Sequence, residues 1–168
     1  GLPSFTLVGL ADTEVKEARE RVRSAIQNAG LEFPANKRIT VNLAPADLPK
    51  DSGRFDLPIA LGILAASGQI DGRKLAGYEF AGELSLSGIL RPVRGALAMS
   101  LALQTRAEQP LRQVLPPESA AAAALVPWSV VYRAGSLHVA VRRFLRPGTP
   151  SPPPPPGNVQ LSPRTPAP

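Results

Sequence analysis

One short loop of this chain carries the residues whose types and spacing could do chemistry. Lys50, Asp51 and Ser52 follow one another just before an apolar stretch that begins near residue 56. The group could be a Ser–Lys hydrolase dyad, a cradle for a phosphate, or only the polar start of a helix. A dyad needs a desolvated lysine whose lowered pKa lets it take the serine proton. Because an adjacent carboxylate such as Asp51 raises a lysine pKa, we expect local structure rather than catalysis here.

Other chemistries lack the residues they require. The sequence contains neither a G-x-x-x-x-G-K-[ST] phosphate loop nor a G-x-G-x-x-G dinucleotide fingerprint. With no cysteine and a single histidine, His138, it offers no cluster of metal ligands. A Ser–His–Asp triad would depend on that histidine alone and lacks a nucleophile elbow, so a structural role is expected for His138.

The elements that must position the loop begin with a strand over residues 5–10 and a helix over 12–30. Asp12 can cap this helix, and Gly30 suits its end. Its charged outer face, with Glu17 and Arg21 spaced i,i+4, is expected to face solvent. The apolar face combines six residues at helical spacing: Val15, Ala18, Val22, Ala25, Ile26 and Ala29.

The loop itself lies between a strand at 38–45 and a helix at 56–66. Asp56 occupies the expected N-cap position, with Pro58 in the first turn. Because this helix is apolar nearly all round, it should be buried.

Residues 78–93 predict two strands joined by a turn near Ser87–Gly88. Helices at 95–107, 118–126 and 136–145 then alternate with strands at 113–117 and 129–134, and Ser136 caps the last helix. This alternation favours parallel pairing, and the hairpin adds an antiparallel pair. We therefore predict an α+β fold with a mixed β-sheet and packed helices.

Composition changes at Pro147. The last 22 residues hold 10 of the 20 prolines and too little apolar material to form a core. We predict one domain over residues 1–146 and a disordered Pro-rich linker over 147–168, with a further domain expected after it. The net charge of +6 favours a polyanionic partner, nucleic acid first, although an arginine-rich surface without a ligand explains the charge equally well.

Three blocks of this sequence resemble the N-terminal domain of the ComM/YifB family of magnesium-chelatase-like AAA+ ATPases. They are "GLPSFTLVGLADTEVKEARERVRSAIQNAG", "RITVNLAPADLPKDSGRFDLPIALGILAASGQI" and "GELSLSGILRPVRGAL". The resemblance covers essentially all of residues 1–146. It implies a fold of the ribosomal protein S5 domain 2 type, shared with the proteolytic domain of Lon and the C-terminal domain of RadA.

The same resemblance bears on the opening loop. Lon-type proteases carry P-K-D-G-P-S-A-G, whereas this chain has "PKDSGRFDLPIAL" and places Asp56 at about the position of the nucleophilic serine. The position of the catalytic lysine corresponds to about Leu97. The resemblance therefore implies that both dyad members are absent and that this chain is not a working protease.

For the parent protein, the resemblance implies a hexameric ring ATPase acting in DNA branch migration during natural transformation. ATP and Mg²⁺ would bind an ATPase domain outside this sequence, and no cofactor is expected here. The first hypothesis is a non-catalytic accessory domain that contacts DNA and helps assemble the ring. Its candidate phosphate contacts are Lys50, Arg54, Lys37, Arg38, Arg91 and Arg94.

The alternative is a protein-interaction or oligomerisation module without DNA contact, which would dock on the ATPase ring or on a neighbouring subunit. A residual hydrolase that uses Ser52 and Lys50 is the least favoured hypothesis. The aromatic residues, Tyr78 and Tyr132 among them, are scattered along the chain, so no cluster for base stacking is expected. With no apolar run of about 18 residues and no leader pattern, we expect a cytoplasmic protein without a membrane partner.

Overall fold

The computed structural model describes residues 4–8, 12–34, 38–42, 53–106 and 112–148 of the 168-residue chain. The first half of the described chain contains β1 (Ser4–Val8), α1 (Asp12–Asn28), β2 (Arg38–Asn42), α2 (Asp56–Ala66) and the short 3-10 helix η1 (Gly72–Leu75). The second half contains β3 (Tyr78–Phe80), β4 (Glu83–Leu84), β5 (Leu90–Arg91), α3 (Ala96–Arg106), β6 (Arg112–Leu115), α4 (Pro117–Ala123), β7 (Val130–Arg133) and α5 (Leu137–Arg142).

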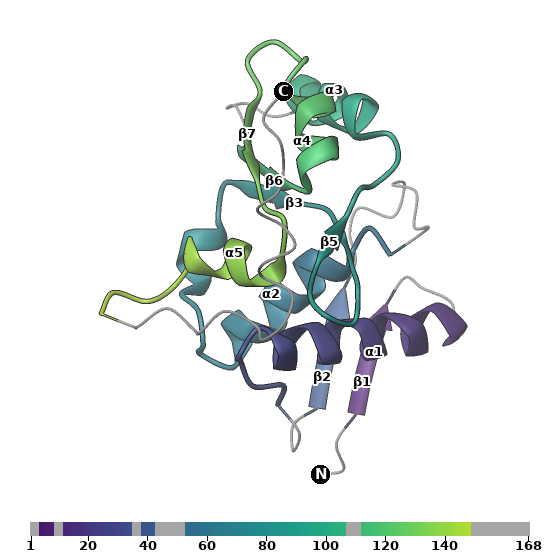
Figure 1. The fold of residues 1–168 in the computed structure, drawn as a ribbon, viewed down its shortest axis with the longest axis vertical. Helices are drawn as coiled ribbons and strands as arrows, with labels where there is room; N and C mark the ends of the chain where they lie inside the picture. The colour runs from purple at the N-terminus through teal and green to yellow at the C-terminus, as the bar shows by residue number, and fades with distance from the viewer. Residues whose placement is uncertain (1–3, 9–11, 35–37, 43–52, 107–111, 149–168) are drawn as a thin grey trace.

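Helices α1 and α2 pack on a pair of parallel strands, β1 and β2 (Figure 1). The apolar face predicted for α1 is confirmed from Ala18 to Ala29, and these side chains are buried. Gly30 ends the helix with a φ of 81°, a left-handed conformation that glycine adopts without strain. Helix α2 begins and ends where the sequence predicted and contributes six buried residues to the main apolar core, including Leu57, Leu61 and Leu64.

A second, parallel sheet has the strand order β3–β6–β7. Helices α3 and α4 pack against each other beside it, above α5 in Figure 1. A small apolar cluster joins β6 to α4 through Leu115, Ala120 and Ala123. Helix α5 starts at the predicted cap, where the Ser136 hydroxyl accepts a hydrogen bond from the Val139 N–H.

The α+β class, with parallel strands and packed helices, is confirmed. The region 78–93 differs in detail, because it forms three strands rather than two. Strands β4 and β5 form the antiparallel hairpin, and Gly88 in its turn has a φ of 91°. Strand β3 pairs instead with β6, so within the described residues the hairpin is a sheet of its own. No helix in the described part of the chain is long and apolar enough to cross a membrane.

Candidate nucleic-acid interface and the corner at the start of helix α2

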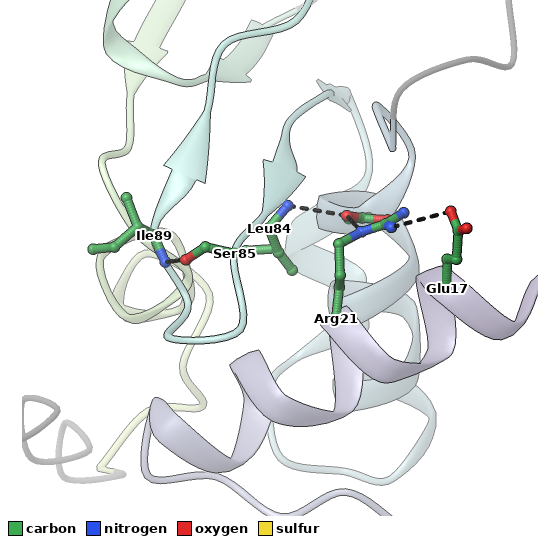
Figure 2. Close-up of polar contacts among 6 residues, drawn as sticks. Glu17, Arg21, Leu84, Ser85 and Ile89 are labelled. Carbon is green, nitrogen blue, oxygen red and sulfur yellow. Dashed lines mark hydrogen bonds and ion pairs between the residues drawn. The ribbon is translucent and has the colours of Figure 1, made fainter. Parts of the chain in front are cut away.

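An ion pair fixes the first residue of α2. The Asp56 carboxylate accepts hydrogen bonds from Arg21 Nε at 2.7 Å and Arg21 Nη2 at 3.2 Å, and from the Leu84 backbone N–H at 3.0 Å. The side chain of Asp56 is only 1% exposed. Figure 2 shows Arg21 reaching across from α1 to this carboxylate, with Leu84 on its other side. The contact therefore joins α1, α2 and β4.

Two further carboxylates surround this pair. Glu17 lies 4.0 Å from Arg21 Nη1, which places the predicted i,i+4 contact at the limit of an ion pair (Figure 2). Glu83 acts on both Arg21 and Asp56 through its charge. Burial raises the pKa of the Asp56 carboxyl above its ordinary value, although the hydrogen bonds from Arg21 and Leu84 oppose that shift. The hydrogen bond to Asp56 raises the pKa of Arg21.

Two sequence predictions are wrong at this corner. Phe55, rather than Asp56, is the N-cap of α2, and no side chain caps the helix. The Asp56 carboxylate has a tertiary partner instead, because a guanidinium binds a carboxylate more strongly than a neutral donor does. Arg21 was expected on a solvent-facing surface, but its side chain is 22% exposed and turns inward to Asp56.

The hydrogen-bonding groups at Asp56 include no serine hydroxyl and no lysine amine. A carboxylate held by a guanidinium and a backbone N–H cannot replace a serine hydroxyl activated by a neutral amine. Leu97, at the position matched to the catalytic lysine, lies on α3 with 41% of its surface exposed. Lys50, Asp51 and Ser52 lie outside the described residues.

The predicted basic contacts divide between two places. Arg91 and Arg94 are exposed on and just after β5, and Arg91 is paired across the hairpin with Glu83. Arg38 is exposed at the start of β2, beside a groove of about 250 Å³ that the last turns of α2 also line. Unlike Arg38, Arg94 lies near the first residues of α2, because its backbone carbonyl accepts a hydrogen bond from Arg54. These residues therefore do not form one continuous surface.

Arg54 is placed differently from the exposed loop contact that we predicted. Its side chain is buried, with the residue 6% exposed, and Nη2 lies 3.2 Å from the Arg94 carbonyl oxygen and 3.3 Å from the Met99 sulfur. A buried guanidinium that is hydrogen-bonded to a backbone carbonyl stabilises the local structure and is not accessible to phosphates. Lys37 lies outside the described residues, as does Lys50.

The expectation that the aromatic residues stay apart is wrong. Tyr78 and Phe80 of β3 meet Tyr132 of β7 and Phe144, with ring centroids 5.1–6.0 Å apart. The sequence separation of β3 and β7 concealed this cluster, which parallel pairing through β6 brings together. The sequence analysis also did not identify Arg112 and Arg143, which contact Tyr78 and Tyr132, because both are more than 60 residues from Lys50 in the sequence.

The described residues contain no group of three or more His, Asp or Glu side chains placed to hold a metal ion. His138 lies half-buried on α5. The candidate functional features of the described residues are therefore the exposed arginines, the clustered aromatic rings and the buried pair at Asp56.

Comparison with known proteins shows the family to which this chain belongs. The profile of the family described as "Subunit ChlI of Mg-chelatase" matches residues 1–119. The match covers most of the chain, including the Arg21–Asp56 corner and the hairpin. The chain belongs to this family.

Curated relatives narrow the resemblance to the ComM/YifB group. The chain is 63% identical over 98 residues to "Uncharacterized protein YifB" of Escherichia coli, covering 58% of this chain and 19% of that protein. It is 62% identical over 104 residues to "Competence protein ComM" of Haemophilus influenzae, covering 62% of this chain and 20% of that protein. A mycobacterial relative, "Uncharacterized protein Mb2921c" of Mycobacterium bovis, is 43% identical over 102 residues, or 61% of this chain and 20% of its own. The matched region thus spans about a fifth of these relatives.

Proposed function

We propose that residues 1–146 are a non-catalytic accessory domain of a magnesium-chelatase-like AAA+ ATPase, which contributes to DNA binding and to assembly of the ATPase ring. The parent would act in ATP-dependent DNA branch migration in the cytoplasm. ATP and Mg²⁺ would bind in the ATPase domain, to which residues 147–168 would be the linker. The match to a relative named for competence supports this context.

The observation that carries the non-catalytic part is the bonding of Asp56. A residual hydrolase would need an accessible nucleophile where the resemblance places one. The carboxylate found there is 1% exposed and holds three hydrogen bonds. A serine-directed fluorophosphonate probe tests this assignment, and we expect no labelling of the chain, at Ser52 or elsewhere.

The positive charge supports the DNA-binding part. Arg38, Arg91 and Arg94 are exposed, and exposed guanidinium groups bind phosphates without reading base sequence. Binding is therefore expected to be non-specific and to weaken steeply as salt rises.

Fluorescence anisotropy of the purified chain with labelled single-stranded, duplex and branched DNA tests this part directly. The variant Arg38→Gln/Arg91→Gln/Arg94→Gln should weaken binding. A matched control, Lys16→Gln/Arg19→Gln/Arg23→Gln, removes the same charge from the outer face of α1. No binding of the unmodified chain at low salt would contradict DNA contact by this domain.

The alternative of a protein-interaction module draws on a different surface. Trp128 is 85% exposed with a φ of 69°, and its neighbour Leu125 is 73% exposed. A bulky residue in the left-handed region stores strain of order 1–2 kcal/mol, and an exposed tryptophan is typical of interfaces. Sedimentation of the chain and of Trp128→Gly distinguishes this alternative: self-association that the substitution abolishes would favour it.

A further inference from the structure

A groove between β7 and α5 has, among its described lining residues, none of the basic residues that the sequence singled out. It has a volume of about 380 Å³. Val114 and Ala140 contribute buried apolar atoms to its lining, and both residues belong to or border the main core. Tyr132 forms one wall, and the exposed arginines Arg133, Arg142 and Arg143 complete the lining.

The tyrosine and one arginine form a built contact. The Arg143 guanidinium carbon lies 4.0 Å from the centroid of the Tyr132 ring. A guanidinium stacked on a ring keeps its planar edge of N–H donors free for a second partner, and the stack limits the rotamers it must lose on binding. Tyr132 is itself held by the aromatic cluster, at 6.0 Å from Tyr78.

A second stack extends this surface along the sheet. The Arg112 guanidinium carbon lies 5.6 Å from the Tyr78 centroid. Arg112 is exposed on β6, the strand between β3 and β7. Cation–π contacts between an arginine and a tyrosine therefore occur on β6 and at the end of α5, and the two tyrosine rings contact each other.

The charged residues in the described lining of the groove are all positive. Its lining contains three arginines and no carboxylate. None of the three forms an ion pair with another residue in the described ranges. Unneutralised guanidinium groups gathered over low-dielectric apolar atoms concentrate positive potential, which attracts polyanions.

We propose that the β7–α5 groove is a binding site for the phosphodiester backbone of nucleic acid, held by Arg133, Arg142 and Arg143, with Arg143 preset by its stack on Tyr132. Planar guanidinium groups match phosphate oxygens with paired hydrogen bonds. Contacts to phosphate oxygens fix the position of the backbone and carry no sequence information. This inference rests on the proposed DNA-binding function and gives it a location.

The test is fluorescence anisotropy of the 168-residue chain with a labelled single-stranded oligonucleotide, titrated with salt. The variant Arg133→Gln/Arg142→Gln/Arg143→Gln should weaken binding at least about tenfold at low salt and lower the slope of log Kd against log salt by about 2 to 3. The α1 control Lys16→Gln/Arg19→Gln/Arg23→Gln should change Kd less than about threefold. Circular dichroism verifies that each variant is folded.

Two additional measurements do not depend on that triple variant. Arg143→Lys keeps the charge but loses the planar stack, and a several-fold loss of affinity is expected; unchanged binding overturns the role of the stack. Phenylglyoxal modification read by mass spectrometry should show Arg133, Arg142 and Arg143 protected by the oligonucleotide, with Arg19 still modified. Equal modification of all four with and without DNA overturns the site even if the triple variant does not fold.

The outcomes separate the two proposals. If the unmodified chain binds no DNA, the proposed function fails and the groove has no ligand of this kind. If the chain binds DNA and the groove variant binds equally well, while Arg38→Gln/Arg91→Gln/Arg94→Gln binds less, DNA binding stands and the β7–α5 site is refuted.

Discussion

Replacing Asp56 by alanine should be among the most damaging single substitutions in this domain. The change removes the acceptor for two Arg21 hydrogen bonds and for the Leu84 N–H at once. It therefore removes the polar contact that joins the start of α2 to α1 and to β4. The expected result is a large loss of stability.

The magnitude follows from what remains after the substitution. Removing one partner of a buried ion pair costs about 3–5 kcal/mol. An orphaned buried N–H such as that of Leu84 costs about 1–3 kcal/mol. Arg21 retains 22% exposure and has Glu17 at 4.0 Å, so water and a second carboxylate recover part of the loss. We therefore expect about 3 kcal/mol, a substantial part of the roughly 5–15 kcal/mol that stabilises a typical domain.

Urea denaturation followed by far-UV circular dichroism measures this loss. Fluorescence is the weaker probe, because Trp128 is 85% exposed in the folded chain. The matched control is Glu20→Ala, whose partner Arg23 lies at 2.8 Å on the exposed face of α1. An exposed pair of this kind contributes about 0–1 kcal/mol, so the control should barely move the midpoint.

A double-mutant comparison provides the refutation. Arg21→Met alone leaves a buried, unpaired carboxylate and should also be strongly destabilising. Arg21→Met/Asp56→Ala removes both charges and should lose less stability than the sum of the two single losses, because neither charge is then left alone. If Asp56→Ala loses less than about 0.5 kcal/mol, the range of an ordinary surface change, or if the two single changes simply add, Asp56 is not held as we describe.

Three further predictions use urea midpoints. Partial burial raises the pKa of the Glu79 carboxyl above its ordinary 4.5, so its contribution to stability is complete below the unfolded pKa and is lost as pH rises through the folded value. The urea midpoint of Glu79→Gln should therefore rise relative to that of the unmodified chain between pH 4 and pH 7. An equal difference in midpoint at both pH values contradicts this prediction. Gly53→Ala should cost about 2 kcal/mol of stability, because the φ of Gly53 is 69° and a Cβ there would lie 2.8 Å from the Glu83 side chain. The control Gly77→Ala has a φ of 82° but open space around it, so it should cost about 1 kcal/mol. Equal losses in the two variants would exclude the close approach to Glu83. Gln113→Leu leaves the Ser100 hydroxyl, 2.8 Å from Gln113 Oε1, without its acceptor, so Ser100→Ala/Gln113→Leu should be the more stable of the two variants.

Most elements of this fold could be read from the sequence because their signals are local. The spacing of apolar residues placed α1 and α2, and Ser136 and Gly30 marked helix ends by the chemistry of capping and of left-handed backbone. The hairpin turn at Gly88 was found for the same reason. Strand β3 was merged with the hairpin because two short strands separated by two residues give one continuous pattern.

The side-chain contacts at the candidate sites could not be predicted from the sequence in the same way. Arg21 and Asp56 are 35 residues apart, and Arg54 lies 40 residues from the carbonyl it binds. The sequence alone does not distinguish a solvent-exposed charged residue from one in a buried ion pair. Only the packing of α1 against α2 shows that Arg21 is paired with Asp56. The same limit applies to Tyr132 and Arg143, whose contact depends on how α5 returns over β7.

The buried Arg21–Asp56 pair and the proposed β7–α5 groove would have different roles in the domain. Asp56 stands where the resemblance places a nucleophile, and its bonding to Arg21 makes that corner a joint between α1, α2 and the hairpin. The Arg21–Asp56 contact should remain formed in the folded domain, since breaking it would leave the buried carboxylate without its partner. Binding that must engage and release a polyanion is better suited to exposed arginines such as Arg143, whose charges no carboxylate of the groove neutralises. Loss of the joint should therefore lower stability, whereas loss of the groove should lower affinity with stability retained, and each set of variants above measures one of these effects without the other.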